Sequence, residues 1–445
     1  MLSRLNTEEM VNSSTSVASP AAAVDLAHVR RHARGFWIVA FVFTITMAFA
    51  AAPAPLYVLY QQREGFSTVT ITGIFAVYAA GVVVSLFLAG HISDRFGRRR
   101  VIAPAVLLNV IAALVFLVWP DLPGLMLARF ICGLGIGMLT ATATAHISEL
   151  HSAARPGAGP RRAEVISTAA NIGGLGIGPL LTGLMAEYVP MPLYTPYVVF
   201  AFLLLIGLLL MATVPETVKH IDGTWTYRPQ RVVVPRAGRG EYAAVSLMAF
   251  VGFAMFGFFT SLAPTFISGR LGITSHMVAG AVTFVVFASS AAFQVLSSRW
   301  TRTAQFAVGL TLLATGLALV TTAITVASLP VLIAGGIVAG SGVGVIFKSA
   351  IGTVIAVSPS DTRGEALAGL FLVSYVGMAL PVVLLGLIMQ TVPPVPSVVM
   401  FGAVMLALIV ITAITLIRTI GRGVSAPAGM LAATKETIQG RVHHG

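Results

Sequence analysis

The sequence predicts an all-α polytopic membrane protein with twelve transmembrane helices. Its 445 residues are 57% hydrophobic and only 9% charged, which is too little charge for the surface of a soluble chain of this length. Apolar runs of about the ~20 residues that cross ~30 Å of hydrocarbon recur along the whole chain. The basic residues between these runs gather on one side of the predicted membrane. Together these observations exclude a soluble fold.

Each apolar run predicts one membrane helix, because it is rich in Leu, Val, Ile, Phe, Ala and Gly and is bounded by charged residues or by Pro-containing turns. In chain order the runs occupy residues 36–60, 69–91, 100–119, 122–148, 163–187, 193–213, 242–268, 275–297, 303–327, 330–356, 365–390 and 396–419.

The Lys and Arg positions test this topology. With the N-terminus inside, only Arg63 and Arg270 of the 27 basic residues fall on the outer side, and only Arg129 and Lys348 lie well inside spans rather than at a span end. An excess of Lys and Arg marks cytoplasmic loops. The distribution therefore predicts an inner or plasma membrane protein with both termini in the cytoplasm. The formal charge of +12 reflects this orientation and contact with anionic lipid, and it does not indicate nucleic-acid binding.

Three landmarks of the first half recur in the second half in the same order, which predicts duplication of a six-helix unit. The paired segments are 54–57 and 263–266, 122–137 and 329–344, and 162–164 and 363–365. Two pseudo-symmetric six-helix bundles follow. The predicted divisions are a disordered cytoplasmic N-terminal tail (1–33), an N-terminal bundle (34–214), a cytoplasmic linker (215–240), a C-terminal bundle (241–420) and a cytoplasmic C-terminal tail (421–445).

A polar, strongly basic segment, Gly90-His-Ile-Ser-Asp94-Arg95-Phe-Gly97-Arg98-Arg99-Arg100, joins the second and third spans. Its pattern G-x-x-x-D-R-x-G-R-R resembles the loop 2-3 signature of the major facilitator superfamily (MFS) of secondary transporters. The resemblance implies the MFS fold, a monomer without a cofactor, and alternating access to a substrate site between the two bundles.

The resemblance also implies a gating role for this loop. In the family, the loop aspartate, the loop arginine and an acidic residue at the end of the fourth helix form a charge cluster that latches the inner side shut. Asp94, Arg98 and Glu149 are the matching residues here. The predicted gating set is Gly90, Asp94, Arg95, Gly97, Arg98 and Glu149. The alternative is a set of loop charges that only orient the protein in the membrane.

Arg129 and Gly133 lie in the fourth span and resemble the arginine-containing motif of that helix in the family. A guanidinium inside the bilayer costs several kcal/mol unless it faces an aqueous cavity or a partner. We therefore expect Arg129 to contact substrate or to take part in coupling. In the alternative, neighbouring carbonyl groups satisfy the arginine and it only fixes helix packing.

The fifth span carries Gly174, Gly178, Pro179 and Gly183, a pattern that resembles the antiporter motif of drug:proton antiporters, although the usual final glycine pair is missing. Glycines admit a close neighbour and a proline bends a helix. The alternative is glycine-rich packing without any antiport meaning. Pro215-Glu216-Thr217, after the sixth span, resembles sugar porters instead, but the second half lacks the matching loop signature.

Further candidates for substrate contact or coupling are titratable or aromatic. His146 and Lys348 could change charge during a cycle, although the lysine could also simply extend to the interface. Aromatic and polar side chains on spans that line the cavity in the resembled fold are Tyr57, Phe253, Phe256, Phe259 and Tyr375, with Asn171 and Gln294. No span has a central carboxylate, which disfavours export of cations through one.

The predicted function is proton-coupled efflux of a small organic molecule or drug. The alternative is a proton- or cation-coupled symporter that imports an organic anion or other metabolite. The expected partners are a small-molecule substrate, protons and the lipid bilayer. Neither an enzyme nor a metal site is expected, since no nucleophile-and-base constellation or metal-ligand cluster occurs and Cys132 is the single cysteine. No phosphate-binding loop supports an ATP-driven pump. A receptor or scaffold that no longer transports is the remaining class.

Overall fold

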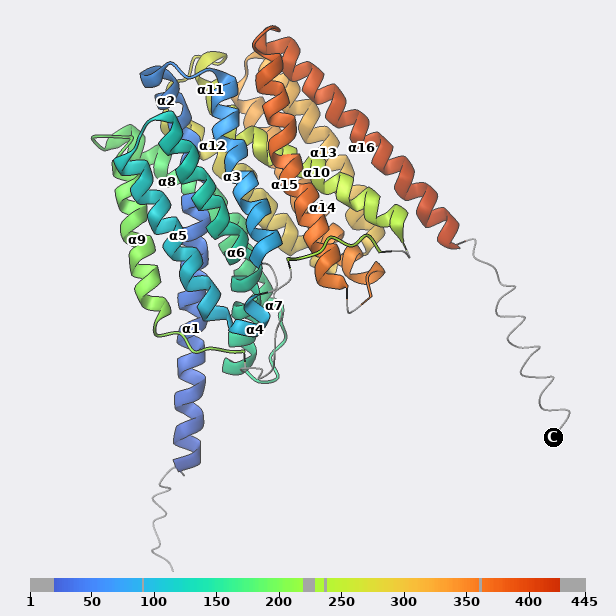
Figure 1. Cartoon of the computed structure of the whole chain (residues 1–445). Coiled ribbons are helices and arrows are strands. Elements are labelled where there is room, and N and C mark those ends of the chain that lie inside the picture. Colours follow the sequence, from blue (N-terminus) through green and yellow to red (C-terminus); the bar gives the residue numbers. More distant parts are fainter. Residues whose placement is uncertain (1–19, 90–91, 219–228, 236–237, 360–361, 425–445) are drawn as a thin grey trace, which may run out of the picture.

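The computed structural model describes residues 20–89, 92–218, 229–235, 238–359 and 362–424, and every regular element among them is helical (Figure 1). The elements of the first half are α1 (Pro20–Ala51), a 3₁₀ turn (Ala54–Leu56), α2 (Tyr57–Glu64), α3 (Thr68–Ala89), α4 (Ser93–Phe96), α5 (Arg98–Val118), α6 (Leu122–Ala154), α7 (Arg161–Thr168), a π-helical turn (Ala169–Gly173), α8 (Gly174–Tyr188) and α9 (Thr195–Met211). Those of the second half are α10 (Arg239–Ser261), α11 (Ala263–Gly269), α12 (His276–Leu296), a 3₁₀ turn (Ser297–Arg299), α13 (Arg302–Val326), α14 (Leu329–Val357), α15 (Arg363–Ile388) and α16 (Pro394–Val424).

The twelve predicted spans are confirmed. Eleven helices among the described residues are long and apolar enough to cross a membrane, and α9 is a shorter apolar helix in the position of the sixth span. Large apolar side chains such as Phe202, Leu209 and Ile417 are more than half exposed on the outside of the bundle. Exposed apolar side chains are stable in contact with lipid tails, and together with the membrane-length helices they identify a multi-pass membrane protein.

Prolines break the first span of each half at corresponding places. α1 ends at Ala51 and is followed by the turn that contains Pro55, and α10 ends at Ser261 just before Pro264. Proline lacks the N–H that a helix interior needs, so the chain starts a new short helix at each point. These breaks lie at the 54–57 and 263–266 pair of the sequence repeat.

One boundary of the first span differs from the sequence prediction. The chain before residue 34 was expected to be a disordered tail, but α1 begins at Pro20 and projects far beyond the bundle (Figure 1). Proline suits the first helical position and the following alanines have the highest helix propensity, which explains the early start. The remaining tail residues, 1–19 and 425–445, and linker residues 219–228 and 236–237 lie outside the described residues.

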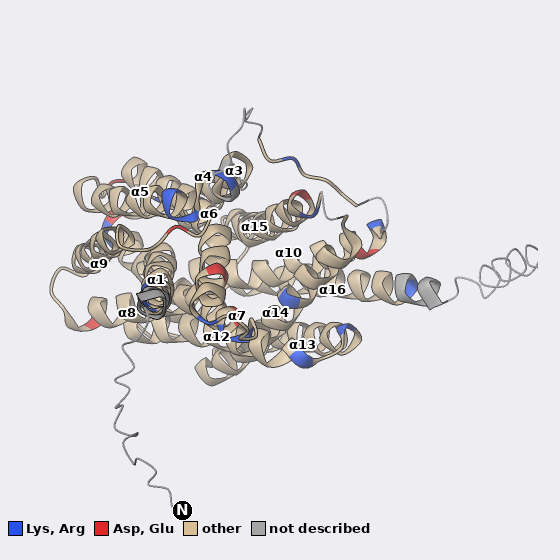
Figure 2. Cartoon of the chain, turned by 90° about the horizontal axis from the view of Figure 1, so that it is seen from below, with Lys and Arg blue, Asp and Glu red and all other residues tan. Residues whose placement is uncertain are grey.

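The buried apolar side chains form two clusters, one drawn mainly from residues 36–214 and the other mainly from residues 242–416. The two halves meet along two seams, where α8 packs against α12 and α3 packs against α15. We call the end that carries α4, α7 and the arginines Arg98, Arg162, Arg302 and Arg363 the basic end. Figure 2 views this end and shows its charged residues. The opposite end carries α2 and α11, at the top of Figure 1.

Candidate functional site

A central cavity lies between the two halves, with an empty volume of about 790 Å³. Its walls come from α1, α2, α3, α6, the π-helical turn and α8 of the first half, and from α10, α12, α14 and α15 of the second half. The lining residues that the argument uses are Tyr57, Phe75, Tyr78, Arg129, Asn171, Phe256, Phe287, Ser290, Phe347, Phe371 and Tyr375.

Arg129 is the one charged side chain among the described residues that line the cavity. It is only 2% exposed. Its Nη1 donates to the carbonyl oxygen of Ala50 at 2.6 Å, and its guanidinium lies 4.3 Å from the ring centroid of Tyr78. Its Nε is buried without a hydrogen-bond partner among the described residues. A carbonyl and an aromatic face attract the cation but do not neutralise it, so its positive charge remains directed at the cavity.

Besides Arg129 and Phe253, four of the sequence candidates line this cavity. Tyr57, Phe256 and Tyr375 contribute rings, and Asn171 contributes an amide. Asn171 lies in the π-helical turn, a type of distortion that is frequent at functional sites. Of the other two aromatic candidates, Phe253 also lines the cavity, whereas Phe259 is fully buried elsewhere in the second-half core.

The remaining candidates lie apart from the central cavity. Lys348 follows Phe347 on α14 and is half-buried, and it does not line the cavity. Gln294 is also absent from the wall. His146 is fully buried, and its Nε2 lies 3.1 Å from the carbonyl oxygen of Pro215. The histidine therefore holds the segment after α9 against α6.

Several wall residues were missed by the sequence analysis, chiefly Phe75, Tyr78, Phe287 and Ser290. One signal could have indicated the first pair. Phe75 and Tyr78 are three residues apart on α3, so both lie on one helical face. That face leads to Gly81, where α3 crosses α6.

A second cavity extends from the central cavity toward the basic end. The two share Thr140, Phe371 and Tyr375, and the second also reaches Gln230 of the linker and Gly364 at the start of α15. The second cavity therefore lies between the central site and the basic end.

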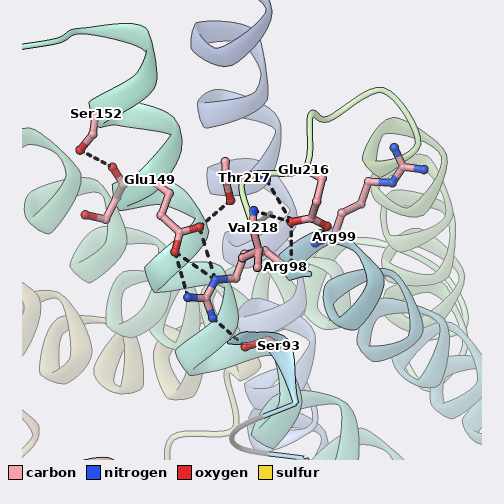
Figure 3. Close-up of polar contacts among 9 residues, drawn as sticks. Ser93, Arg98, Arg99, Glu149, Ser152, Glu216, Thr217 and Val218 are labelled. Carbon is pink, nitrogen blue, oxygen red and sulfur yellow. Dashed lines mark hydrogen bonds and ion pairs between the residues drawn. The ribbon is translucent and has the colours of Figure 1, made fainter. Parts of the chain in front are cut away.

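At the basic end, Arg98 and Glu149 form an ion pair with 2.9 Å between Nη2 and Oε1 (Figure 3). Arg98 Nε also donates to the same carboxylate at 3.1 Å, and Nη1 donates to Ser93 Oγ at 2.8 Å. The hydroxyl of Thr217 donates to Glu149 Oε2. These partners belong to the first half and to the start of the linker, so the pair ties α4 and α5 to α6 and to the segment that follows α9.

Glu216 adds an interaction that the sequence did not predict. Its carboxylate accepts the backbone N–H groups of Arg98 at 2.8 Å and Arg99 at 3.1 Å, at the start of α5 (Figure 3). A carboxylate at a helix N-terminus satisfies free N–H groups and complements the helix dipole. Gly97 precedes these groups with φ +105°, and a Cβ there would meet the Glu216 carboxylate. A glycine is therefore required at this position.

Other members of the predicted gating set are less fully placed. Gly90 and the side chain of Asp94 lie outside the described residues. Arg95 lies in α4, next to the Arg98 network. The proposed role of this set as a latch stays a prediction.

The predicted glycine motif of the fifth span makes close contacts with α1 of the same half and, at Gly183, with α12 across the seam between the halves. A Cβ at Gly174 or Gly178 would meet the backbone of α1, and one at Gly183 would meet the carbonyl oxygen of His276 on α12. Reciprocally, a Cβ at Gly280 would meet the carbonyl oxygen of Pro179. Gly133 has the same relation to α3 of its own half. These contacts are close backbone approaches of the kind that small residues allow in membranes.

Hydrogen bonds cross between the halves at two places at the opposite end. Glu187, next to the last residue of α8, accepts the backbone N–H groups of His276 at 2.8 Å and Met277 at 3.4 Å. The hydroxyl of Thr265 on α11 donates to Gln61 Oε1 on α2 at 3.0 Å. With the Gly183–Gly280 contact, these bonds close the opposite end over the cavity.

Comparisons with known proteins agree with this architecture. The family model described as Major Facilitator Superfamily matches residues 36–303. A crystal structure of a POT family transporter in complex with 5-aminolevulinic acid superimposes with a TM-score of 0.69 at 13% identity, covering 86% of this chain and 96% of that one. At this identity the likeness concerns the fold alone.

Curated relatives match shorter segments. The Arabinose-proton symporter of Bacillus subtilis (strain 168) is 44% identical over 69 residues, which are 16% of this chain and 15% of the symporter. An uncharacterised MFS-type transporter of Methanocaldococcus jannaschii is 24% identical over 160 residues, or 36% of this chain and 40% of that protein. Solute carrier family 22 member 12 of Rattus norvegicus is 31% identical over 111 residues, or 25% of this chain and 19% of its own length. The chain thus matches less than half the length of each. The antiporter subgroup predicted from residues 174–183 is not confirmed by these relatives, which include a symporter.

Proposed function

The chain belongs to the Major Facilitator Superfamily and is a membrane transporter, and on this premise we propose that it couples the uptake of a small organic molecule to the entry of protons. Alternating access would move the substrate through the central cavity, which has walls from both halves. The observation that carries the proposal is this cavity, closed at the opposite end and continued by a second cavity toward the basic end.

We further propose that the basic end faces the cytoplasm. The Lys and Arg distribution of the sequence supports this orientation, and so does the row of arginines at one end of the helices. The state described here would then be open toward the cytoplasm and closed to the outside. The first half would move as a unit, because the Arg98, Glu149 and Glu216 interactions tie its loops together.

The proposed direction of transport and the proposed coupling ion rest on a comparison with a named relative. The named symporter among the relatives favours proton-coupled uptake over the efflux first predicted. One observation favours efflux by exchange. The backbones of α8 and α12 approach closely at Gly183 and Gly280, and such tight packing between the halves would limit uncoupled passage of ions.

Transport in proteoliposomes tests this function. The purified chain would be reconstituted, a pH gradient imposed, and an untargeted mixture of small metabolites added and quantified inside by mass spectrometry. We expect at least one compound to accumulate when the gradient is inward, and to lose this accumulation with a protonophore or in Arg129→Ala. Accumulation only under an outward gradient would establish efflux instead. Equilibration that ignores the gradient would contradict coupling.

A further inference from the structure

The central cavity contains three buried polar groups that have no hydrogen-bond partner among the described residues. They are Nε of Arg129, the hydroxyl of Tyr57 and the hydroxyl of Ser290. Each of these side chains is at most 2% exposed, and each lines the cavity. A buried polar group without a partner is costly. Three such groups in the wall of one cavity indicate a site where a bound ligand supplies the missing hydrogen-bond partners.

The chemistry of the three groups selects the ligand. Arg129 and Tyr57 lie on the wall of the same cavity, and both can donate hydrogen bonds. A carboxylate offers acceptor oxygens and the negative charge that the arginine lacks. Ser290, on α12 of the second half, can add a donor from the other side.

The rest of the wall is mostly apolar, apart from Asn171 and the hydroxyl groups of Tyr78, Tyr375, Thr140 and Thr260. Aromatic rings come from both halves, and two of the wall hydroxyls are already engaged within their own helices, since Thr140 donates to Ile136 and Thr260 to Phe256. A sugar would bring several hydroxyl groups into a wall with few free partners, which is unfavourable. An organic cation would meet Arg129 and no carboxylate among the described lining residues.

We propose that the substrate is a small apolar monocarboxylate, with a flat aromatic or similarly hydrophobic body, held by Arg129 and Tyr57 and contacted by Ser290 across the cavity. This inference rests on the proposed function, since it names the substrate class of the same site. Aromatic walls pack a flat body at offset-stacked or edge contacts, and the buried arginine and tyrosine fix the orientation of the carboxylate. Ser290 links substrate binding to the second half.

Equilibrium binding to the full chain in lipid nanodiscs tests the inference independently of transport. The probe is radiolabelled benzoate, with unlabelled benzoate, benzamide, benzylamine and arabinose as competitors. We expect saturable benzoate binding that benzoate itself displaces, benzamide displaces about tenfold less well, and benzylamine and arabinose do not displace. Tyr57→Phe removes only one hydroxyl and should weaken benzoate binding about tenfold or more, as for a hydrogen bond to a charged group.

Matched variants keep the test sharp. Tyr60→Phe is the control, because the Tyr60 hydroxyl bonds to Tyr197 and Tyr60 does not line the cavity; its affinity should stay within about twofold. Arg129→Gln should abolish benzoate binding. If Arg129→Gln does not fold, the affinity of Tyr57→Phe still tests the site. Ser290→Ala should weaken binding about threefold, less than Tyr57→Phe, because the aliphatic hydroxyl of serine is a weaker hydrogen-bond donor than the more acidic phenol of tyrosine.

The outcomes separate this inference from the proposed function. Displacement by arabinose or benzylamine, no benzoate binding, or equal affinities in Tyr57→Phe and Tyr60→Phe would overturn the monocarboxylate site. A gradient-driven uptake of some other compound would leave the proposed function standing in that case. Benzoate binding as predicted, with uptake that ignores the pH gradient, would instead contradict the coupled transport and leave the site in place.

Discussion

A glutamate caps the N-terminus of a helix at each end of the molecule, and the two differ in what they connect. At the basic end, Glu216 accepts the first N–H groups of α5, in its own half. At the opposite end, Glu187 of α8 accepts the first N–H groups of α12, in the other half. The chemistry is the same, a carboxylate at free N–H groups and at the positive end of a helix dipole.

The difference teaches what each contact can do in a transport cycle. A cap within one half can persist while the halves rock, so it stiffens that half. A cap across the halves must break whenever the opposite end opens, so it biases the equilibrium between two states. We therefore expect changes at the basic end to act on stability and on all states, and changes at the opposite end to act on the population of one state.

The largest effect is expected for Arg98→Ala at the basic end. This change leaves the Glu149 carboxylate without its cation in a partly buried position. We expect a loss of about 2–4 kcal/mol of stability, because an unpaired buried charge is costly, and at least a tenfold loss of transport. Arg100→Ala, at an exposed neighbouring position, is the control. Thermal unfolding and uptake measure both, and equal behaviour of the two variants would contradict the network.

A smaller effect is expected for Gly97→Ala. The new Cβ would adopt an unfavourable positive φ and would also meet the Glu216 carboxylate, so about 1–3 kcal/mol of stability should be lost. Gly65→Ala separates the two causes, because Gly65 also has a positive φ and has no neighbouring atom within 4 Å. Thermal unfolding of both variants is the measurement. If Gly65→Ala costs as much, the Glu216 contact contributes nothing.

Glu187→Gln should shift the conformational equilibrium with little effect on stability. Removing the charge weakens the cap on α12 by about 1 kcal/mol, which is about a fivefold rise in the state open at the opposite end. The readout is labelling of Thr260→Cys, in the cavity wall, by a membrane-impermeant maleimide in a Cys132→Ala background. Glu64→Gln is the control, since the ion pair of Glu64 within the described part of the chain is with its neighbour Arg63. Unchanged labelling in Glu187→Gln would show that this cap does not help to hold the opposite end closed.

The smallest effect is expected for Thr265→Val. The isosteric change deletes the hydrogen bond to Gln61 across the halves, worth about 0.5–1 kcal/mol. The same labelling assay should show a rise of about twofold to fivefold. Thr213→Val, which deletes only a bond to the carbonyl of Leu210 at the basic end, should leave labelling unchanged. Equal rates for the two would mean that the Gln61 contact does not hold the opposite end.

The fold was largely predictable from the sequence because a bilayer leaves few options for the backbone. Twelve apolar runs and the paired landmarks of the repeat appear in the structure, whereas the helix breaks near Pro55 and Pro264 fall inside runs that were each predicted as one span. The early start of α1 was missed, since the residues before 34 were classified by their polarity while helix propensity decided the outcome. The π-helical turn at Ala169–Gly173 has no signal in the sequence pattern that we can identify.

The candidate site was predictable only in part. Arg129 stood out because a charge inside a span needs a reason, and the resemblance pointed to Arg98 and Glu149. The contacts of Glu216 and Glu187 could not be predicted, because each depends on which helix N-terminus the folded chain brings next to a loop carboxylate. Phe75 and Tyr78 were hidden among many aromatic residues, since a helix in lipid tolerates rings on every face.

The distances across the two ends test the central claim that the cavity opens alternately to one side and then the other. Spin labels would be placed at exposed positions, Tyr188→Cys with Thr274→Cys at the opposite end and Ser152→Cys with Arg363→Cys at the basic end, in a Cys132→Ala background. The distances between the labels would be measured by pulsed electron paramagnetic resonance in nanodiscs at two pH values, with and without benzoate, and in the Glu187→Gln variant. We predict that whenever the first distance lengthens, the second shortens, and that Glu187→Gln favours the long first distance. Distances that stay fixed in every condition, or that change in the same sense at both ends, would contradict alternating access.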